Sequence, residues 1–367
     1  MRSAIKDYAG WALSHPDQLP SLSLSDWDMV VRQGRSAQVL GRLASELEYL
    51  DLLKDVPAVP RRHLANASLI ARRQQEALRY ELGFIRKALA NVQTPIVLLK
   101  GAAYVMSDQP AARGRVFGDI DILVPKAFLP DVEAALMLHG WITTYHSAYD
   151  QRYYRQWMHE IPPLRHIKRG TIVDVHHNIL PDTCSVCPRA EALLENAINI
   201  PNSDFSVLAP EDMLLHSATH LFMNGEFENG LRDLSDMDLL IKGFVSQDSL
   251  FWEKLLDRAH ELNLGSSLFF ALRYAVEILE TPVPPVVLNA SAKGVRRRWL
   301  APVMDAMFMR ALLPDHPSCR SWSTRLARWL LFIRSHWLRM PPWLLFPHLA
   351  RKTWERWRES LGWEEKQ

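Results

Sequence analysis

Two stretches decide the fold: Leu-Leu-Lys-Gly-Ala-Ala at 98–103 and Gly-Asp-Ile-Asp-Ile-Leu-Val at 118–124. The first is an apolar run that ends in a Lys-Gly pair, a pattern typical of a buried strand that enters a turn. The second stretch predicts another strand. Side chains alternate along a strand, so Asp119 and Asp121 should project from one face and the isoleucines between them from the other.

Two carboxylates on one face of a strand repel each other unless a cation lies between them. Mg²⁺ prefers hard oxygen ligands and usually binds one or two carboxylates together with substrate phosphates. A third carboxylate comes from Asp174, which interrupts an apolar run in the predicted strand at 171–176. We therefore predict that Asp119, Asp121 and Asp174 converge as metal ligands and catalytic residues. Relief of repulsion predicts that Asp121→Asn leaves the metal-free protein as stable or more stable.

Residues around these acids have the chemistry to hold a triphosphate. A glycine lets the backbone approach a phosphate closely, and backbone amides at the start of a helix attract anions. An arginine grips a phosphate through a planar fork, which a lysine does not have. The predicted nucleotide-binding residues are Lys100, Gly101, Ala102, Arg113, Arg115 and His176.

The rest of the chain is organised around this segment as an α+β protein. Residues 1–91 show helical periodicity with a proline-containing break at 56–60, and residues 206–290 return to helical periodicity. Between them, residues 92–205 have the order strand–helix–strand–helix–strand. We predict a small mixed sheet with helices at 92–205, a helical N-terminal region, and a helical region at 206–290 that shapes an acceptor pocket.

The overall composition is that of an ordinary globular protein, with 48% hydrophobic and 23% charged residues. Three cysteines are too few for a disulfide framework, which favours reduced thiols and a cytoplasmic location. No apolar run has the length of about 18 residues that a membrane-spanning helix needs, so such a helix is not expected.

The segment 291–367 differs from the rest of the chain and is predicted to be helical. From residue 293 onward it carries 15 Lys/Arg, 6 Asp/Glu and eight of the 13 tryptophans. A helix over 325–340 would have an apolar face made of Leu326, Trp329, Leu330, Ile333, Trp337 and Met340. That face suits the acidic body of the chain or an anionic membrane surface, where the protein would lie peripherally at the inner face. We favour packing against the body, because closely spaced tryptophans usually need a protein core.

Two further groups invite a metal hypothesis. His176-His177 and Cys184-x-x-Cys187 contain zinc-ligand types, but their order is not an established zinc pattern, so reduced thiols are the favoured interpretation. The second group comes from two successive predicted helices and consists of His216, His220, Asp233 and Asp236. For it we favour a polar contact between helices, or a wall of the acceptor pocket, over a second metal site.

These motifs resemble those of the polymerase β-type nucleotidyltransferases, whose signature is a glycine-containing turn, Asp-x-Asp/Glu and a third acid on a later strand. The Leu-Lys-Gly run, the arginine before Asp-Ile-Asp-Ile-Leu-Val, the Asp-Val-His-His strand and a later Leu-Arg-Asp-Leu are more similar to a bacterial family of uncharacterised nucleotidyltransferases. The resemblance covers about 25–290. It implies transfer of a nucleoside monophosphate from an NTP to a hydroxyl-type acceptor on a small molecule or protein, with Mg²⁺ or Mn²⁺ as cofactor.

Two departures from the superfamily pattern keep a second hypothesis open. Ala102 stands where the wider superfamily often has a serine, and the interval of 18 positions from Gly101 to Asp119 is long. The alternative is a catalytically degenerate module that binds an NTP or a partner, although three acids on facing strands argue against it. Nucleic acid is not expected as a partner, because the basic excess is confined to the C-terminal segment.

Overall fold

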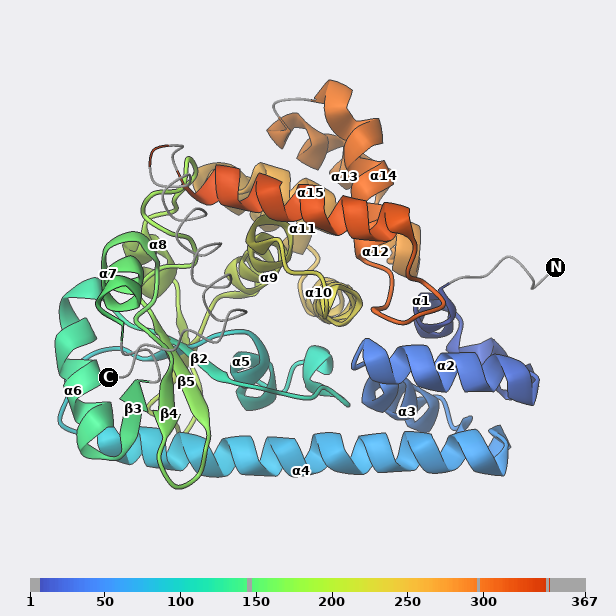
Figure 1. Ribbon diagram of the computed structural model, residues 1–367, viewed down its shortest axis with the longest axis horizontal. Helices are drawn as coiled ribbons and strands as arrows, with labels where there is room; N and C mark the ends of the chain where they lie inside the picture. The colour runs from blue at the N-terminus through green and yellow to red at the C-terminus, as the bar shows by residue number, and fades with distance from the viewer. Residues whose placement is uncertain (1–6, 144–146, 296–297, 341–342, 344–367) are drawn as a thin grey trace, which may run out of the picture.

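The computed structural model describes residues 7–143, 147–295, 298–340 and 343. It shows an α+β fold in which helices from both ends of the chain flank a seven-stranded mixed sheet (Figure 1). This architecture confirms the predicted fold class. Within the described ranges, no helix is both long and apolar enough to cross a membrane.

The sheet has the strand order β3-β4-β5-β2-β1-β7-β6, which places the motif strand β2 in its centre. β2 pairs antiparallel with β1 and parallel with β5, and β1 pairs parallel with β7. The strands are β1 Val97–Leu98, β2 Ile120–Leu123, β3 Trp141–Thr143, β4 Leu164–His166, β5 Ile172–His176, β6 Ile198–Asn199 and β7 Ser206–Val207.

The parallel pairing of β2 with β5 sets the position of the acidic side chains. In this register Asp121 lies opposite Asp174, and Ile122 lies opposite Val175. The isoleucines of β2 and the valines of β5 are buried, as is usual for parallel strands that are covered on both faces. The pairing therefore brings two acids from distant parts of the chain to the same level of the sheet.

Three strands are predicted from the sequence and four are missed. The runs at 96–99, 119–124 and 171–176 are confirmed as β1, β2 and β5. The missed strands are two or three residues long, which is too short for a period of two to be visible. One of them, β7, lies in the range 206–290, which the sequence pattern predicts to be helical.

The predicted helices on either side of the sheet are present. The predicted break at 56–60 overlaps the start of α4, which begins at Ala58, and the range 206–290 contains α9 to α12. α4 is 31 residues long, runs along the bottom of Figure 1, and packs against α3 and α6. The helices are α1 Tyr8–Ser14, α2 Leu24–Ser36, α3 Leu40–Tyr49, α4 Ala58–Ala88, α5 Lys100–Met106, α6 Leu129–Leu138, α7 Ala148–Trp157, α8 Ala190–Glu195, α9 Pro210–Asn224, α10 Gly230–Gln247, α11 Phe251–Glu261, α12 Gly265–Leu279, α13 Pro285–Ser291, α14 Ala301–Ala311 and α15 Trp322–Arg339.

Buried charge pairs hold the N-terminal helices against the sheet and against α10. Arg42 of α3 donates to Asp236 Oδ1 at 2.6 Å and to the carbonyl oxygen of Ala111 at 2.7 Å. Glu81 of α4 accepts two hydrogen bonds from Arg169, at 2.7 and 2.9 Å. Because buried charges need such partners, these contacts fix α3, α4 and α10 relative to the strands that carry the acids.

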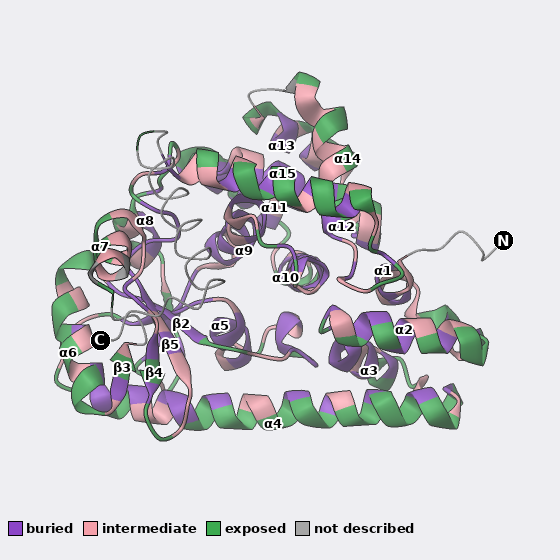
Figure 2. Ribbon diagram, in the orientation of Figure 1, coloured by how far each residue is buried: buried purple, intermediate pink, exposed green. Residues whose placement is uncertain are grey.

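The C-terminal helix α15 packs on the body through a face that the sequence pattern does not predict. Its buried residues are Thr324, Ala327, Leu331 and Ser335. The contact is close at Gly225, where an added Cβ would lie 2.2 Å from Ser335 Oγ. The predicted apolar face, apart from the buried Met340, points outward (Figure 2) through Leu326, Trp329, Leu330, Ile333 and Trp337.

Candidate active site

The three predicted acids come together where β2 and β5 lie side by side. Asp121 is in β2, Asp174 is its register partner in β5, and Asp119 directly precedes β2. One carboxylate oxygen from each residue lies within 4.8 Å of the other two. The predicted convergence of the three acids is therefore confirmed, whereas their roles in catalysis and metal binding stay predictions.

Asp121 is buried and is held in its charged form by two neighbours. Its Oδ1 lies 3.5 Å from Lys100 Nζ and accepts a hydrogen bond of 3.0 Å from His176 Nε2. Burial alone would raise the pKa of Asp121, but Lys100 and His176 more than offset it and hold that pKa well below its usual range. The sequence predicts that Asp121→Asn is at least as stable as the wild type, on the premise that this carboxylate has no partner. The contacts with Lys100 and His176 contradict that premise.

In Asp119 and Asp174, by contrast, the surroundings disfavour the charged form of the carboxyl group. The charge of Asp121, followed by burial, raises the pKa of Asp119. Burial, followed by the charges of Asp121 and Glu160, raises the pKa of Asp174 to about 8. Among the described residues, none forms a hydrogen bond with the buried Oδ1 of Asp174. Three clustered oxygen donors, one of them unpartnered, fit a hard divalent cation such as Mg²⁺ or Mn²⁺.

The turn between β1 and α5 brings Lys100 to these acids. Lys100 begins α5 with a φ of +44°, in the left-handed region, and its side chain reaches Asp121. Burial opposes the charge of Lys100, but the neighbouring carboxylates, Asp121 foremost, keep its pKa above the ordinary value. Gly101 is needed for packing, since a Cβ there would lie 2.5 Å from both Arg115 Nη1 and Phe117 Cδ1.

The other predicted nucleotide-binding residues next to the motif have different surroundings. Arg115 is buried, and its Nε donates a hydrogen bond of 2.8 Å to Asp236 Oδ2, so its charge already has a partner. Ala102 is buried in the core. Arg113 is exposed, and its guanidinium carbon lies 5.6 Å from the centre of the Tyr49 ring. The role of each in nucleotide binding stays a prediction.

Two clefts meet at the acidic cluster, and both are lined by Lys100, Asp119 and Asp121. The first cleft extends toward the start of α10, and its further lining residues include Gly101, Arg115, Asn229 and Arg232. The second cleft lies on the Asp174 side, and its further lining residues include His159, Glu160, Asp174, His176, His216 and Arg339. Neither lining includes Ala102 or Arg113.

Sequence reasoning missed His159 and Glu160 as residues of the site. They follow α7 and stand next to each other in a short connecting segment, where neither strand nor helix periodicity directs attention to them. The isolated bridge between Glu160 and His176 brings them to β5. The one sequence signal was an adjacent pair of titratable residues.

The zinc hypothesis for His176-His177 with Cys184 and Cys187 finds no support in the described part of the chain. Neither cysteine belongs to a group there that could hold a metal. The thiol of Cys184 donates to the carbonyl oxygen of Leu338 at 3.2 Å, and both cysteines are free. Reduced thiols remain the better interpretation.

The second group considered from the sequence is also not a metal cluster within the described residues. Asp236 accepts hydrogen bonds from Arg42 and Arg115, so it contributes to the polar contact between elements. His216 lines the second cleft, and His220 lines both clefts. Asp236 thus joins α10 to α3 and to the segment before β2, and the two histidines line the clefts; the acceptor pocket itself stays a prediction.

The fold and the acidic cluster agree with a nucleotidyltransferase. The chain belongs to the uncharacterised nucleotidyltransferase family, whose profile matches residues 23–280. No curated protein and no solved structure matches the chain. The family indicates transferase activity, and the acidic residues on β2 and β5 lie within the matched range.

The two facing acids should respond oppositely to neutralisation in metal-free protein. Asp121→Asn should lower the free energy of unfolding at pH 7 by on the order of 1–3 kcal/mol, because Lys100 and His176 lose a charged partner. Asp174→Asn should raise it. The pKa of Asp174 is about 8 in the folded state and near 4 in the unfolded state, so the unfolded state loses this proton first. The free energy of unfolding of the wild type therefore falls as the pH rises from about 4 to about 8.

Chemical denaturation in EDTA at pH 5 and pH 8 measures both effects. The gain from Asp174→Asn should be larger at pH 8 than at pH 5. An increase in the free energy of unfolding that is the same at both pH values would show that the titration of Asp174 does not destabilise the folded state. Unchanged stability in Asp121→Asn would show that Lys100 and His176 do not depend on its charge.

Proposed function

We propose that this protein is a metal-dependent nucleotidyltransferase that moves a nucleoside monophosphate from an NTP to a hydroxyl-type acceptor on a small molecule or protein. The observation that carries the proposal is the convergence of Asp119, Asp121 and Asp174 at the junction of two clefts. Family membership supports it. Placement in the polymerase β-type superfamily, a bacterial origin and a cytoplasmic location belong to the same proposal.

Asp119, Asp121 and Asp174 are the residues that would hold Mg²⁺ or Mn²⁺. When bound, such an ion neutralises charge on the triphosphate and favours its alignment for attack. Lys100 lines both clefts beside Asp121, so it is placed to neutralise further negative charge. The presence of all three acids argues against the alternative, a catalytically degenerate binding module.

The nucleotide is assigned to the first cleft because that cleft contains two arginines besides Lys100. Arg115 and Arg232 line it, although both already pair with carboxylates of α10. Gly101 lines the same cleft and is placed to let a phosphate approach the backbone. The predicted contacts of Ala102 and Arg113 receive no support from the lining of the clefts.

The acceptor is assigned to the second cleft because Asp174 lines that cleft and not the first. The acceptor oxygen would attack the α-phosphorus of the NTP, forming a new P–O bond. The bond from the α-phosphorus to the oxygen that bridges it to the β-phosphorus would break, and pyrophosphate would leave. The acceptor proton would pass to the Asp174 carboxylate, which has the role of general base.

A label-transfer screen tests this function. The protein is incubated with each of the four α-³²P-labelled NTPs, Mg²⁺ or Mn²⁺, and cell extract, and transfer of label to any acceptor is followed. Asp174→Asn should reduce transfer by about 10²–10⁴-fold, as expected for loss of a general base. Asp182→Asn is the matched control, because Asp182 is exposed, pairs with Lys126 and lines neither cleft.

The outcomes separate the two hypotheses. Metal-dependent transfer that Asp174→Asn abolishes and Asp182→Asn preserves supports the enzyme. Saturable NTP binding without transfer to any acceptor, under every metal and nucleotide tested, would favour the degenerate binding module instead.

We also propose peripheral contact with an anionic membrane surface through 325–340. Trp329 and Trp337 are each 58% exposed on the outward side of α15, and Arg325 is exposed on the same helix. The chain from residue 293 carries the excess of Lys/Arg noted above. Tryptophan rings beside cationic side chains suit the interface of an anionic bilayer.

Replacing Trp329 and Trp337 together by alanine should leave the stability nearly unchanged and reduce co-sedimentation with phosphatidylserine vesicles about tenfold. Leu331→Ala is the matched control on the inward side of the same helix, where Leu331 is 1% exposed. It should instead lower the free energy of unfolding by about 2–5 kcal/mol. Wild-type protein that does not sediment with these vesicles would refute membrane contact.

A further inference from the structure

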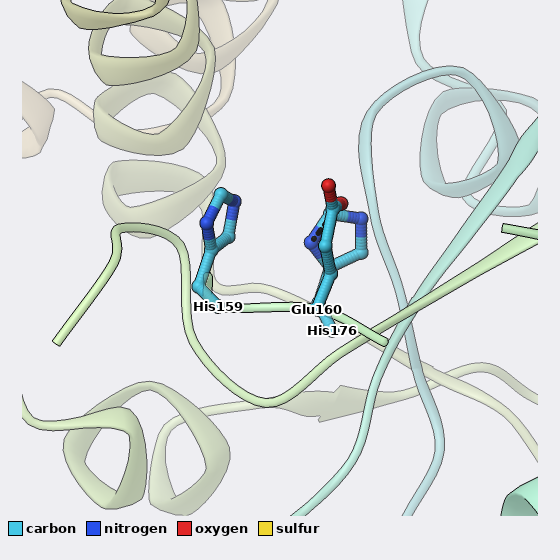
Figure 3. A group of neighbouring side chains, drawn as sticks. All are labelled: His159, Glu160 and His176. Atoms are coloured by element: carbon cyan, nitrogen blue, oxygen red, sulfur yellow. Dashed lines mark ion pairs between the residues drawn. The ribbon is translucent and has the colours of Figure 1, made fainter. Parts of the chain in front are cut away.

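A second group of metal-ligand side chains lies beside the aspartates. His159 and Glu160 follow α7, and Glu160 forms a bridge with His176 at the end of β5. One donor atom from each of the three residues lies within 4.8 Å of the other two. Figure 3 shows the ring of His159 beside the overlapping side chains of Glu160 and His176. The second cleft is lined by all three residues.

The imidazole nitrogens of this group are poorly satisfied by the protein itself. His176 Nδ1 lies 3.4 Å from Glu160 Oε2, yet neither it nor His159 Nδ1, both buried atoms, has a hydrogen-bond partner among the described residues. Two ligand atoms on one tetrahedral Zn²⁺ lie roughly 3.3 Å apart, given bonds of about 2.0–2.1 Å. The spacing of Nδ1 and Oε2 therefore matches two atoms that share a metal.

The other nitrogen of His176 is already positioned for such a role. His176 Nε2 donates to Asp121 Oδ1 at 3.0 Å, so in the neutral ring Nδ1 is the nitrogen that carries the lone pair for a metal. A histidine that binds a metal usually donates its second N–H to a carboxylate, which fixes the ring and increases its basicity. Asp121 would supply that contact here.

We propose that His159, Glu160 and His176 bind a divalent transition metal of the Zn²⁺ type, separate from the ion assigned to the three aspartates. Two imidazoles and one carboxylate are suited to Zn²⁺ or Co²⁺, whereas three carboxylates are suited to Mg²⁺. Three protein ligands leave a coordination position open, and the residues face the second cleft. Binding at this site does not depend on nucleotidyl transfer.

The metal-free full-length chain is titrated with Co²⁺ while excess Mg²⁺ occupies hard oxygen sites, and visible absorption reports the coordination. We expect one equivalent of Co²⁺ with the strong bands of a four-coordinate site. His159→Ala and Glu160→Gln should each weaken binding by about 10²-fold or more, since each removes a ligand, and Asp121→Asn by about 10–100-fold, since it removes a contact to a ligand. Asp119→Asn and His139→Ala are the controls and should bind as the wild type does, because neither residue belongs to the group.

X-ray absorption of the wild-type protein loaded with one equivalent of Zn²⁺ gives a test that does not need the variants to fold. The expected spectrum contains scattering from two imidazole rings. A shell of oxygen ligands alone would overturn the proposal. So would Co²⁺ binding that Asp119→Asn removes but that folded His159→Ala and Glu160→Gln retain, because the metal would then belong to the aspartates.

Discussion

Two carboxylates lie side by side because β2 and β5 are parallel neighbours with Asp121 and Asp174 in direct register. Their repulsion is the constraint to which the surrounding structure is adapted. Lys100 and His176 offset the charge of Asp121, which keeps that carboxylate ionised. Among the residues that the structure describes, Asp174 has no comparable partner, and its pKa rises to about 8. A bound cation would relieve this remaining imbalance, which is the physical basis for assigning a metal to the cluster.

The helices around the sheet keep this charged centre in place. Asp236 of α10 accepts hydrogen bonds from Arg42 of α3 and from Arg115 in the segment before β2, so one buried carboxylate joins three parts of the chain. Asp121, in turn, contacts the imidazole of His176, which lies beside Glu160 in the second group. The two proposed metal sites are thus linked through the contact between Asp121 and His176, so a change at either of these two residues should affect both sites.

Much of the fold and the core of the site could be predicted from the sequence, because they depend on short-range patterns. The strand period of two placed Asp119 and Asp121 together, and the apolar run around Asp174 marked it as exceptional. The cationic neighbours of Asp121, and the pair at 159–160, depend on contacts between distant segments, so no local pattern revealed them. The orientation of α15 was missed because only two of its four buried residues, Ala327 and Leu331, are apolar, so the inward face has a weaker hydrophobic pattern than the outward face.

The central claim is that the three aspartates hold a metal that also contacts the nucleotide. The most direct test is electron paramagnetic resonance of bound Mn²⁺ in the presence of an NTP analogue that cannot be cleaved between its α- and β-phosphorus atoms. Hyperfine coupling between Mn²⁺ and ³¹P should appear in the wild type and be lost in Asp119→Asn and in Asp174→Asn. Coupling that persists in both variants, or is absent from the wild type with both ligands bound, would contradict the claim.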